Sequence, residues 1–218
     1  IMIGGGLVGV LGWYMVASGL EKDPDVSHYR LAIHLCAAFS VFALVLWTAF
    51  DIHSGRAAFA GNGTSPARWA RALLVLLLLQ IIWGAFTAGL DAGHIYNTWP
   101  LMNGTFMPEN VRAFGDLVTD LSDHRDGVQF IHRNLAYLVA AAFVVFAIIF
   151  RREAAMEDVW IALLIGVLLQ FVLGVLTLLT QVDLTLGVLH QLGALALLSI
   201  LLKALHRTGK RLTSSTPA

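Results

Sequence analysis

The sequence predicts an all-α membrane protein with six transmembrane helices, and two observations carry that prediction. Hydrophobic residues make up 58% of the 218 residues and charged residues only 13%, whereas soluble domains carry about 25% charged residues. Apolar runs of about 18 residues or more recur along the chain, and each can cross a bilayer as a helix. The expected spans cover residues 2–20, 31–50, 72–90, 128–150, 159–180 and 186–205.

All six spans should be helices, because hydrocarbon offers backbone polar groups no water to hydrogen-bond. The formal net charge is zero, so no basic surface indicates a nucleic-acid partner. The single cysteine, Cys36, has no second cysteine with which to form a disulfide within the chain. The composition predicts a multi-pass protein in contact with membrane lipid.

The charges of the loops orient the predicted spans. Ten of the 14 acidic residues fall in or beside one alternating set of loops, which includes the long loop 91–127. The other set carries most of the basic residues, so the positive-inside rule places it in the cytoplasm. This orientation puts the C-terminus inside and loop 91–127 outside. The basic residues of the cytoplasmic set are Arg56, Arg68, Arg71, Arg151, Arg152, Lys203, Arg207, Lys210 and Arg211.

Three histidines lie at one predicted depth. His34, His132 and His190 each stand about one helical turn inside a span that runs from outside to inside. Because helical residues rise about 1.5 Å each, the three imidazoles should share a level near the outer face. A histidine buried in a membrane is costly and usually functional, although a single one can also serve as a helix–helix hydrogen bond. An alanine follows each histidine four residues on, which leaves room for a flat ligand on the same helix face.

A repeated motif precedes two of these histidine-bearing spans. Residues 80–87 and 170–177 both read Q-x3-G-x2-T, and a fainter copy surrounds Gly12. Each copy stands in the span before a histidine-bearing span, so the predicted repeating unit is a helix pair. Coincidence between similar apolar helices is the alternative interpretation.

The last four spans predict an up-down-up-down bundle with short connections. Consecutive helices are neighbours in such a bundle, so the spans of His132 and His190 should lie diagonally. Neighbouring helices pack about 8–10 Å apart, too close for a porphyrin between them, whereas a diagonal pair can hold one with an imidazole on each side of the iron. Gly84 and Gly174, on the intervening helices, would let the porphyrin edges approach the backbone. Histidine is a normal axial haem ligand, and no cysteine–histidine cluster with zinc spacing competes.

The same rule leaves His34 without a diagonal partner. That partner would stand two helices earlier, before Ile1, and the chain opens abruptly inside an apolar run. We therefore expect two preceding helices, and a full protein with eight helices in two similar four-helix halves. On this division residues 1–71 belong to the N-terminal half and residues 72–206 form the C-terminal half. Residues 207–218 are expected to form a disordered cytoplasmic tail.

The stretch GLDAGHIYNTWPLMNG, residues 89–104, follows the third span and is rich in aromatic residues. We expect it to cover one edge of the haem pocket, with Trp99 and Tyr96 as the covering side chains. Simple anchoring in the aromatic belt at the membrane surface is the alternative. Arg133, next to His132, is the candidate partner of a haem propionate, because arginine binds carboxylates through two parallel hydrogen bonds.

Five stretches together resemble a known family. They are LGWYMVASGL (11–20), DVSHYRLAIHL (25–35), GLDAGHIYNTWPLMNG (89–104), QFIHRNLAYL (129–138) and GVLHQLGALALL (187–198). They resemble haem A synthase of the type found in α-proteobacteria and mitochondria. The resemblance implies an eight-helix oxidoreductase of the bacterial inner membrane. Such an enzyme oxidises the C8 methyl group of haem O to a formyl group and so supplies haem A to cytochrome oxidase. The resemblance also implies a haem b cofactor between His132 and His190, with His34 as one of two histidines at the catalytic site that takes haem O.

One motif of that family is absent from this chain. Members carry Glu-x-x-x-His-Arg on the second helix of the full protein, and the sequence contains neither that glutamate nor that histidine. The resemblance therefore implies that this chain alone lacks synthase activity. The alternative function is a non-enzymatic membrane cytochrome with two histidine ligands that relays electrons. Haem O synthase and cytochrome oxidase assembly factors are the implied protein partners, while self-association and the electron acceptor stay open.

Overall fold

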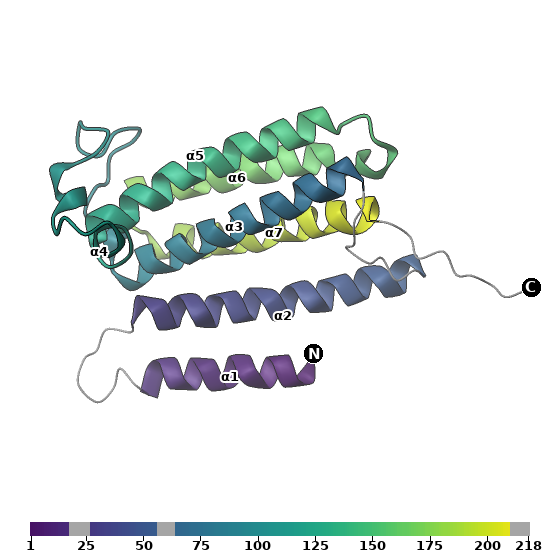
Figure 1. The fold of residues 1–218 in the computed structure, drawn as a ribbon, viewed down its shortest axis with the longest axis horizontal. Coiled ribbons are helices and arrows are strands. Elements are labelled where there is room, and N and C mark those ends of the chain that lie inside the picture. Colours follow the sequence, from purple (N-terminus) through teal and green to yellow (C-terminus); the bar gives the residue numbers. More distant parts are fainter. Residues whose placement is uncertain (18–26, 56–63, 210–218) are drawn as a thin grey trace, which may run out of the picture.

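The computed structural model describes residues 1–17, 27–55 and 64–209, and these residues are helical apart from one isolated β-bridge and the connecting turns (Figure 1). The prediction of an all-α protein is therefore confirmed for the described residues. Three short 3₁₀ helices, η1 (Ala92–His94), η2 (Glu109–Arg112) and η3 (Ala154–Met156), lie in the connections. The α-helices are α1 (Met2–Ala17), α2 (His28–Ser54), α3 (Ser65–Gly89), α4 (Leu117–Ser122), α5 (Arg125–Ile149), α6 (Trp160–Leu179) and α7 (Leu184–Thr208).

Five of these helices, α2, α3, α5, α6 and α7, are long and apolar enough to cross a membrane. Helix α1 is apolar but is described over only 16 residues, fewer than the roughly 20 that a bilayer core needs. The first expected span, 2–20, therefore coincides with α1 up to Ala17, and its last three residues lie outside the described residues.

Several helix ends differ from the expected spans by three residues or more. Helix α3 begins at Ser65 rather than at residue 72, because Pro66 is compatible with a first helical turn, where its missing N–H needs no partner. Helix α7 continues to Thr208. Residues 207 and 208, which the sequence assigned to the tail, are therefore the last residues of α7, and residues 210–218 lie outside the described part of the chain.

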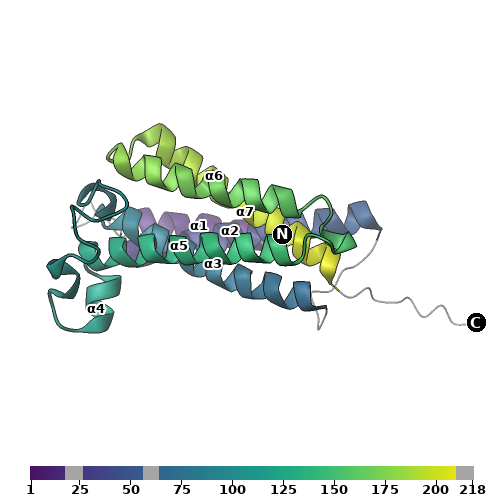
Figure 2. The ribbon, with the colours of Figure 1, turned by 90° about the horizontal axis from the view of Figure 1, so that it is seen from above.

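Four helices pack around one another in the part of the structure that contains the largest core. Helices α3 and α6 each pack against both α5 and α7, so α5 and α7 lie across from one another. Helix α2 packs against α3 and α7, and α1 packs against α2 on the side away from the other four (Figures 1 and 2). The core between the four helices contains the fully buried side chains of Phe143, Phe146, Leu163 and Leu201.

Helix direction brings the three histidines to the same end of the molecule. The first residues of α2, α5 and α7 lie at the end that also carries the connection 90–124 (Figure 1), which we call the loop end. His34 stands six residues after the first residue of α2, His132 seven after that of α5, and His190 six after that of α7. All three imidazoles therefore belong to the second turn of a helix that starts at the loop end.

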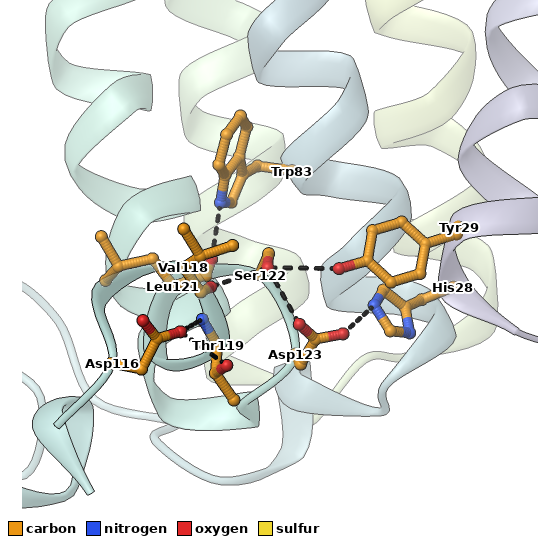
Figure 3. A network of polar contacts seen from close by, with 9 residues as sticks. All are labelled: His28, Tyr29, Trp83, Asp116, Val118, Thr119, Leu121, Ser122 and Asp123. Atoms are coloured by element: carbon orange, nitrogen blue, oxygen red, sulfur yellow. Dashed lines mark hydrogen bonds and ion pairs between the residues drawn. The ribbon is translucent and has the colours of Figure 1, made fainter. Parts of the chain in front are cut away.

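Helix α2 is held by the loop end of the C-terminal helices. His28 Nε2 lies 3.4 Å from Asp123 Oδ1, and the Tyr29 hydroxyl donates to Ser122 Oγ over 3.2 Å (Figure 3). Ser122 is the last residue of α4, and Asp123 follows it directly. The start of α2 is thus joined by polar contacts to a segment about 90 residues further along the chain.

Helix α4 in turn is docked onto α3 and α5. Trp83 of α3 donates its indole N–H to Leu121 O over 3.0 Å (Figure 3). Gly127, in the first turns of α5, leaves room for the backbone of α4, since a Cβ at that position would stand only 1.7 Å from Asp120 O. A residue with a side chain at position 127 would push α4 away.

A second set of contacts holds α2 at the opposite end. His206 Nε2 of α7 lies 2.9 Å from Asp51 Oδ1 of α2, and the Trp47 ring lies edge-on to the His206 imidazole. Helix α2 is therefore joined to the C-terminal helices near both of its ends.

Candidate functional site

A cavity of about 480 Å³ opens among α2, α3, α5, α6, α7 and the connection after α3. Its volume lies within the range of about 300–1,000 Å³ that is typical of small-molecule sites. Apolar side chains such as Leu77, Ile81 and Phe171 form most of its wall. The polar groups on that wall include three histidines, of which His132 and His190 stand on long helices and His94 on the connection.

The two histidines reach the cavity from helices that lie across from one another. His132 comes from α5 and His190 from α7, and both side chains line the same space. One turn further along each helix, Ala136 and Ala194 also line the cavity. Because alanine side chains are small, they leave space for a flat ligand next to each imidazole.

Gly84 and Gly174 contact the histidine rings themselves. A Cβ at Gly84 would stand 3.1 Å from His132 Cε1, and one at Gly174 would stand 2.9 Å from His190 Cε1. The sequence predicted that these glycines admit the edge of a porphyrin. The structure shows that each admits the imidazole of the neighbouring helix, while both glycines also line the cavity.

Two glutamines that the sequence analysis recognised only as part of a repeat contact the same histidines. Gln80 Nε2 lies 3.2 Å from His132 Nδ1 and donates to His132 O over 3.2 Å. Gln170 Nε2 lies 3.2 Å from His190 Nδ1 and donates to His190 O over 2.9 Å. The Q-x3-G part of the motif therefore places one amide and one glycine against each imidazole.

His34 repeats part of this arrangement outside the cavity wall. A Cβ at Gly12 of α1 would stand 3.0 Å from His34 Cε1, which is the glycine–imidazole contact found at the other two histidines. Among the described residues, His34 Nδ1 is buried without a hydrogen-bond partner. The structure thus brings His132 and His190 to one cavity and places His34 apart from it on α2.

Arg133 lines the cavity, and its guanidinium also contacts the connection after α3. Its Nη2 donates to Thr98 O over 2.9 Å and to Pro100 O over 3.2 Å. Longer bonds reach Tyr96 O and Leu101 O. Because the guanidinium bonds four carbonyls between residues 96 and 101, Arg133 fixes the shape of this connection, a role that the sequence did not predict.

Further contacts hold the connection over the loop end of the cavity. Asn97 Nδ2 donates to Gly93 O over 2.7 Å and to Leu178 O over 2.8 Å, which joins the connection to α6. Trp99 and His94 line the cavity, and the Trp99 ring lies 6.4 Å from that of Phe171. The connection therefore forms part of the cavity wall, as the expected covering role requires.

The Tyr96 hydroxyl donates to Asp126 Oδ1 over 2.5 Å. Burial raises the pKa of Tyr96 to about 12, and the hydrogen bond and negative charge of Asp126 act in the same direction. The phenol is therefore neutral and a hydrogen-bond donor throughout the physiological pH range.

No group of three or more histidine, cysteine, aspartate or glutamate side chains is placed to hold a metal ion among residues 1–17, 27–55 and 64–209. The opposed pair His132 and His190 is instead a donor set with two nitrogen ligands. Such a set suits an iron whose remaining positions are filled by a macrocycle.

Comparison with known proteins yields one family and several relatives. The model of the COX15-CtaA family, described as a cytochrome oxidase assembly protein, matches residues 1–202. The chain is 40% identical over 194 residues to a protein named heme A synthase from Pelagibacter ubique, with 88% of this chain and 56% of that protein covered. It is 44% identical over 214 residues to the heme A synthase of Flavobacterium johnsoniae, with 94% and 62% covered. It is 42% identical over 201 residues to that of Caulobacter vibrioides, with 90% and 58% covered. The chain thus spans about three fifths of the length of these relatives.

Proposed function

This chain belongs to the COX15-CtaA family of cytochrome oxidase assembly proteins, and we propose on that basis that it is part of a haem A synthase. In this proposal the complete protein is an oxidoreductase that converts haem O to haem A by oxidising the C8 methyl group. The observation that carries the proposal is the pair His132 and His190, which line one cavity from helices that lie across from one another. The family assignment agrees with the resemblance seen in the sequence.

The residues of the cavity fit a haem b cofactor, whose iron His132 and His190 would bind. The wall supports this assignment, since it is largely apolar and has alanines, Ala136 and Ala194, below the two imidazoles. When bound, the haem would supply one-electron chemistry. The chain itself orients both rings, excludes water with its apolar wall, and closes the loop end with the connection that carries Trp99.

We assign His34 to the part of the protein that takes haem O. In this proposal residues 1–71 belong to the substrate half and residues 72–206 form the cofactor half. The family's Glu-x-x-x-His-Arg motif does not occur in these 218 residues. We therefore expect this chain alone not to convert haem O, and we assign the reaction to the full length of its relatives.

The proposed location is the bacterial inner membrane, with the loop end on the periplasmic side. The apolar helices support a multi-pass membrane protein, and the orientation follows from the basic residues at the opposite ends of the helices. The proposed partners are haem O, membrane lipid, haem O synthase and assembly factors of cytochrome oxidase.

Titration of the purified chain with haemin tests the cofactor site. We expect one haem to bind with the absorption spectrum of an iron with two histidine ligands, and we expect both His132→Ala and His190→Ala to abolish that spectrum. His94→Ala is the matched control, because His94 lines the same cavity from the connection rather than from α5 or α7. A colourless wild-type chain, or a spectrum that survives both substitutions, would contradict the proposal.

Activity is tested with a full-length relative in membranes that produce haem O. Formyl haem is the expected product. A relative that binds haem b but yields no formyl haem would favour the electron-relaying cytochrome.

A further inference from the structure

We propose that Gln80 and Gln170 are positioning residues that fix the two iron-facing imidazoles, and that His34, which we call the free ring, lacks the amide contact and can adopt either tautomer. The inference rests on the proposed haem site. It divides the three histidines into two kinds, according to whether the preceding helix carries the glutamine of the repeat. The fixed pair suits a cofactor that remains bound, and the free ring suits a haem substrate that must enter and leave.

Each fixed ring is held from two sides by one neighbouring helix. The carboxamide of Gln170 contacts both the Nδ1 and the carbonyl oxygen of His190, so the ring is fixed relative to its own backbone. Gly174, one turn further along α6, touches the Cε1 edge of the same ring. Gln80 and Gly84 of α3 hold His132 in the same way. Neither imidazole can rotate without losing one of these contacts.

Each glutamine also carries the hydrogen-bond acceptor that an iron-binding histidine needs for its Nδ1 proton. Histidine that binds iron through Nε2 carries its proton on Nδ1, and this N–H usually donates to a second protein group. Among the described residues, Gln80 Oε1 and Gln170 Oε1 are buried without a hydrogen-bond partner. A carboxamide has a donor end and an acceptor end of nearly the same shape. A half-turn of the amide presents Oε1 to the Nδ1 proton when the ring Nε2 binds iron, and it exchanges the bond that Nε2 donates to the histidine carbonyl oxygen for this one.

His34 has the glycine but not the glutamine. The position one turn before Gly12, which corresponds to Gln80 and Gln170, is Val8. A valine side chain neither donates nor accepts a hydrogen bond, and His34 Nδ1 is buried without a partner among the described residues. Since the glycine contact at Gly12 is kept but no amide bonds the Nδ1, we infer that His34 can adopt either tautomer.

The test uses the chain loaded with haemin and compares Gln80→Leu and Gln170→Leu with Ser199→Ala. Ser199 is a matched control on α7, since its hydroxyl donates only one turn back, to Leu195 O. Loss of a contact behind a metal ligand typically weakens binding about 10- to 100-fold. We expect haem to transfer to an excess of a haem-scavenging globin faster by that factor. We also expect the ratio of the chain's affinities for ferric and ferrous haem to change about tenfold. This change corresponds to a shift of about 59 mV in the midpoint potential of the bound haem.

A conservative variant separates positioning from simple packing. Gln170→Glu keeps an acceptor for the Nδ1 proton, so it should restore slow haem release and lower the midpoint potential relative to Gln170→Leu. Equal behaviour of the Glu and Leu variants, or leucine variants that match Ser199→Ala, would overturn the inference. If the wild-type chain binds no haem, or if His132→Ala and His190→Ala still bind it, the proposed haem site fails instead.

The free ring is tested in the opposite direction by Val8→Gln, which introduces the missing amide. In chain with ¹⁵N-labelled histidine, we expect the His34 ring nitrogens of the wild type to report exchange between tautomers and those of Val8→Gln to report one. Should the wild-type ring already report a single tautomer, the distinction between the two kinds of histidine is wrong. This measurement can be made even if the Gln80→Leu and Gln170→Leu variants fail to fold.

Discussion

The glycine behind His190 gives the sharpest prediction, because Gly174→Ala should displace the imidazole and weaken haem binding about 10- to 100-fold. The added Cβ would stand 2.9 Å from His190 Cε1, about 0.6 Å inside an ordinary carbon–carbon contact of about 3.5 Å. Overpacking of this kind costs about 1–3 kcal/mol, while alanine in place of a helical glycine stabilises by about 1 kcal/mol. The net loss of about 0–2 kcal/mol should leave the chain folded, so the defect should appear at the ligand.

The ring cannot move aside freely, because Gln170 holds its Nδ1 edge. Gly9→Ala in α1 is the control, since a Cβ at Gly9 would meet no atom within 4 Å. It should bind haem as the wild type does and unfold at a slightly higher temperature. The assay combines a haemin titration followed by absorbance with thermal unfolding of each apoprotein in the same detergent. If Gly174→Ala binds haem as tightly as Gly9→Ala, the contact with His190 does not position the ligand and the reasoning is refuted.

Three further predictions concern the loop end. Arg133→Ala removes the bonds to backbone carbonyls of residues 96–101, so amide hydrogen exchange there should speed up at least about tenfold; unchanged exchange would show that other contacts suffice. In a difference titration of wild type against Tyr96→Phe, phenolate absorption should appear near pH 12 rather than at the ordinary 10.0. The stabilising contribution of the neutral phenol is complete below pH 10 and is lost as the pH rises through 12, so a phenolate at pH 10 would contradict the burial argument. Trp83→Phe loses the bond to Leu121 O and should lower the stability of the docked segment 117–122 by about 0.5–1.5 kcal/mol, measured by its hydrogen exchange.

Much of the fold could be predicted from the sequence because membrane helices are marked by simple apolar runs. Helices α5, α6 and α7 agree with the expected spans within three residues at each end. The shared depth of the histidines could also be predicted from the sequence. His132 and His190 stand at nearly the same distance from their helix starts, and rise per residue converts that distance directly into depth.

The side-chain roles were harder to predict because they depend on which neighbour each group meets. The pairing of Arg133 with a haem propionate stays a prediction, and a single sequence does not reveal that carbonyls of a folded-back connection lie within its reach. Gln80 and Gln170 appeared in the repeat, but nothing in their spacing identifies a histidine on another helix as the partner. The end of α7 was misplaced because residues 207 and 208 are polar, and Thr208 nevertheless continues the helix and bonds Ala204 O.

Helix α2 is attached at both ends, through Asp123 and Ser122 on one side and through His206 on the other. Because α2 is attached near both ends, it does not slide or pivot independently of the C-terminal helices. The spacing between His34 and His132 is therefore set once the chain has folded. Electron tunnelling slows steeply as the gap between donor and acceptor widens. Redox groups carried at these two positions would therefore exchange electrons across a distance that the contacts of α2 hold constant.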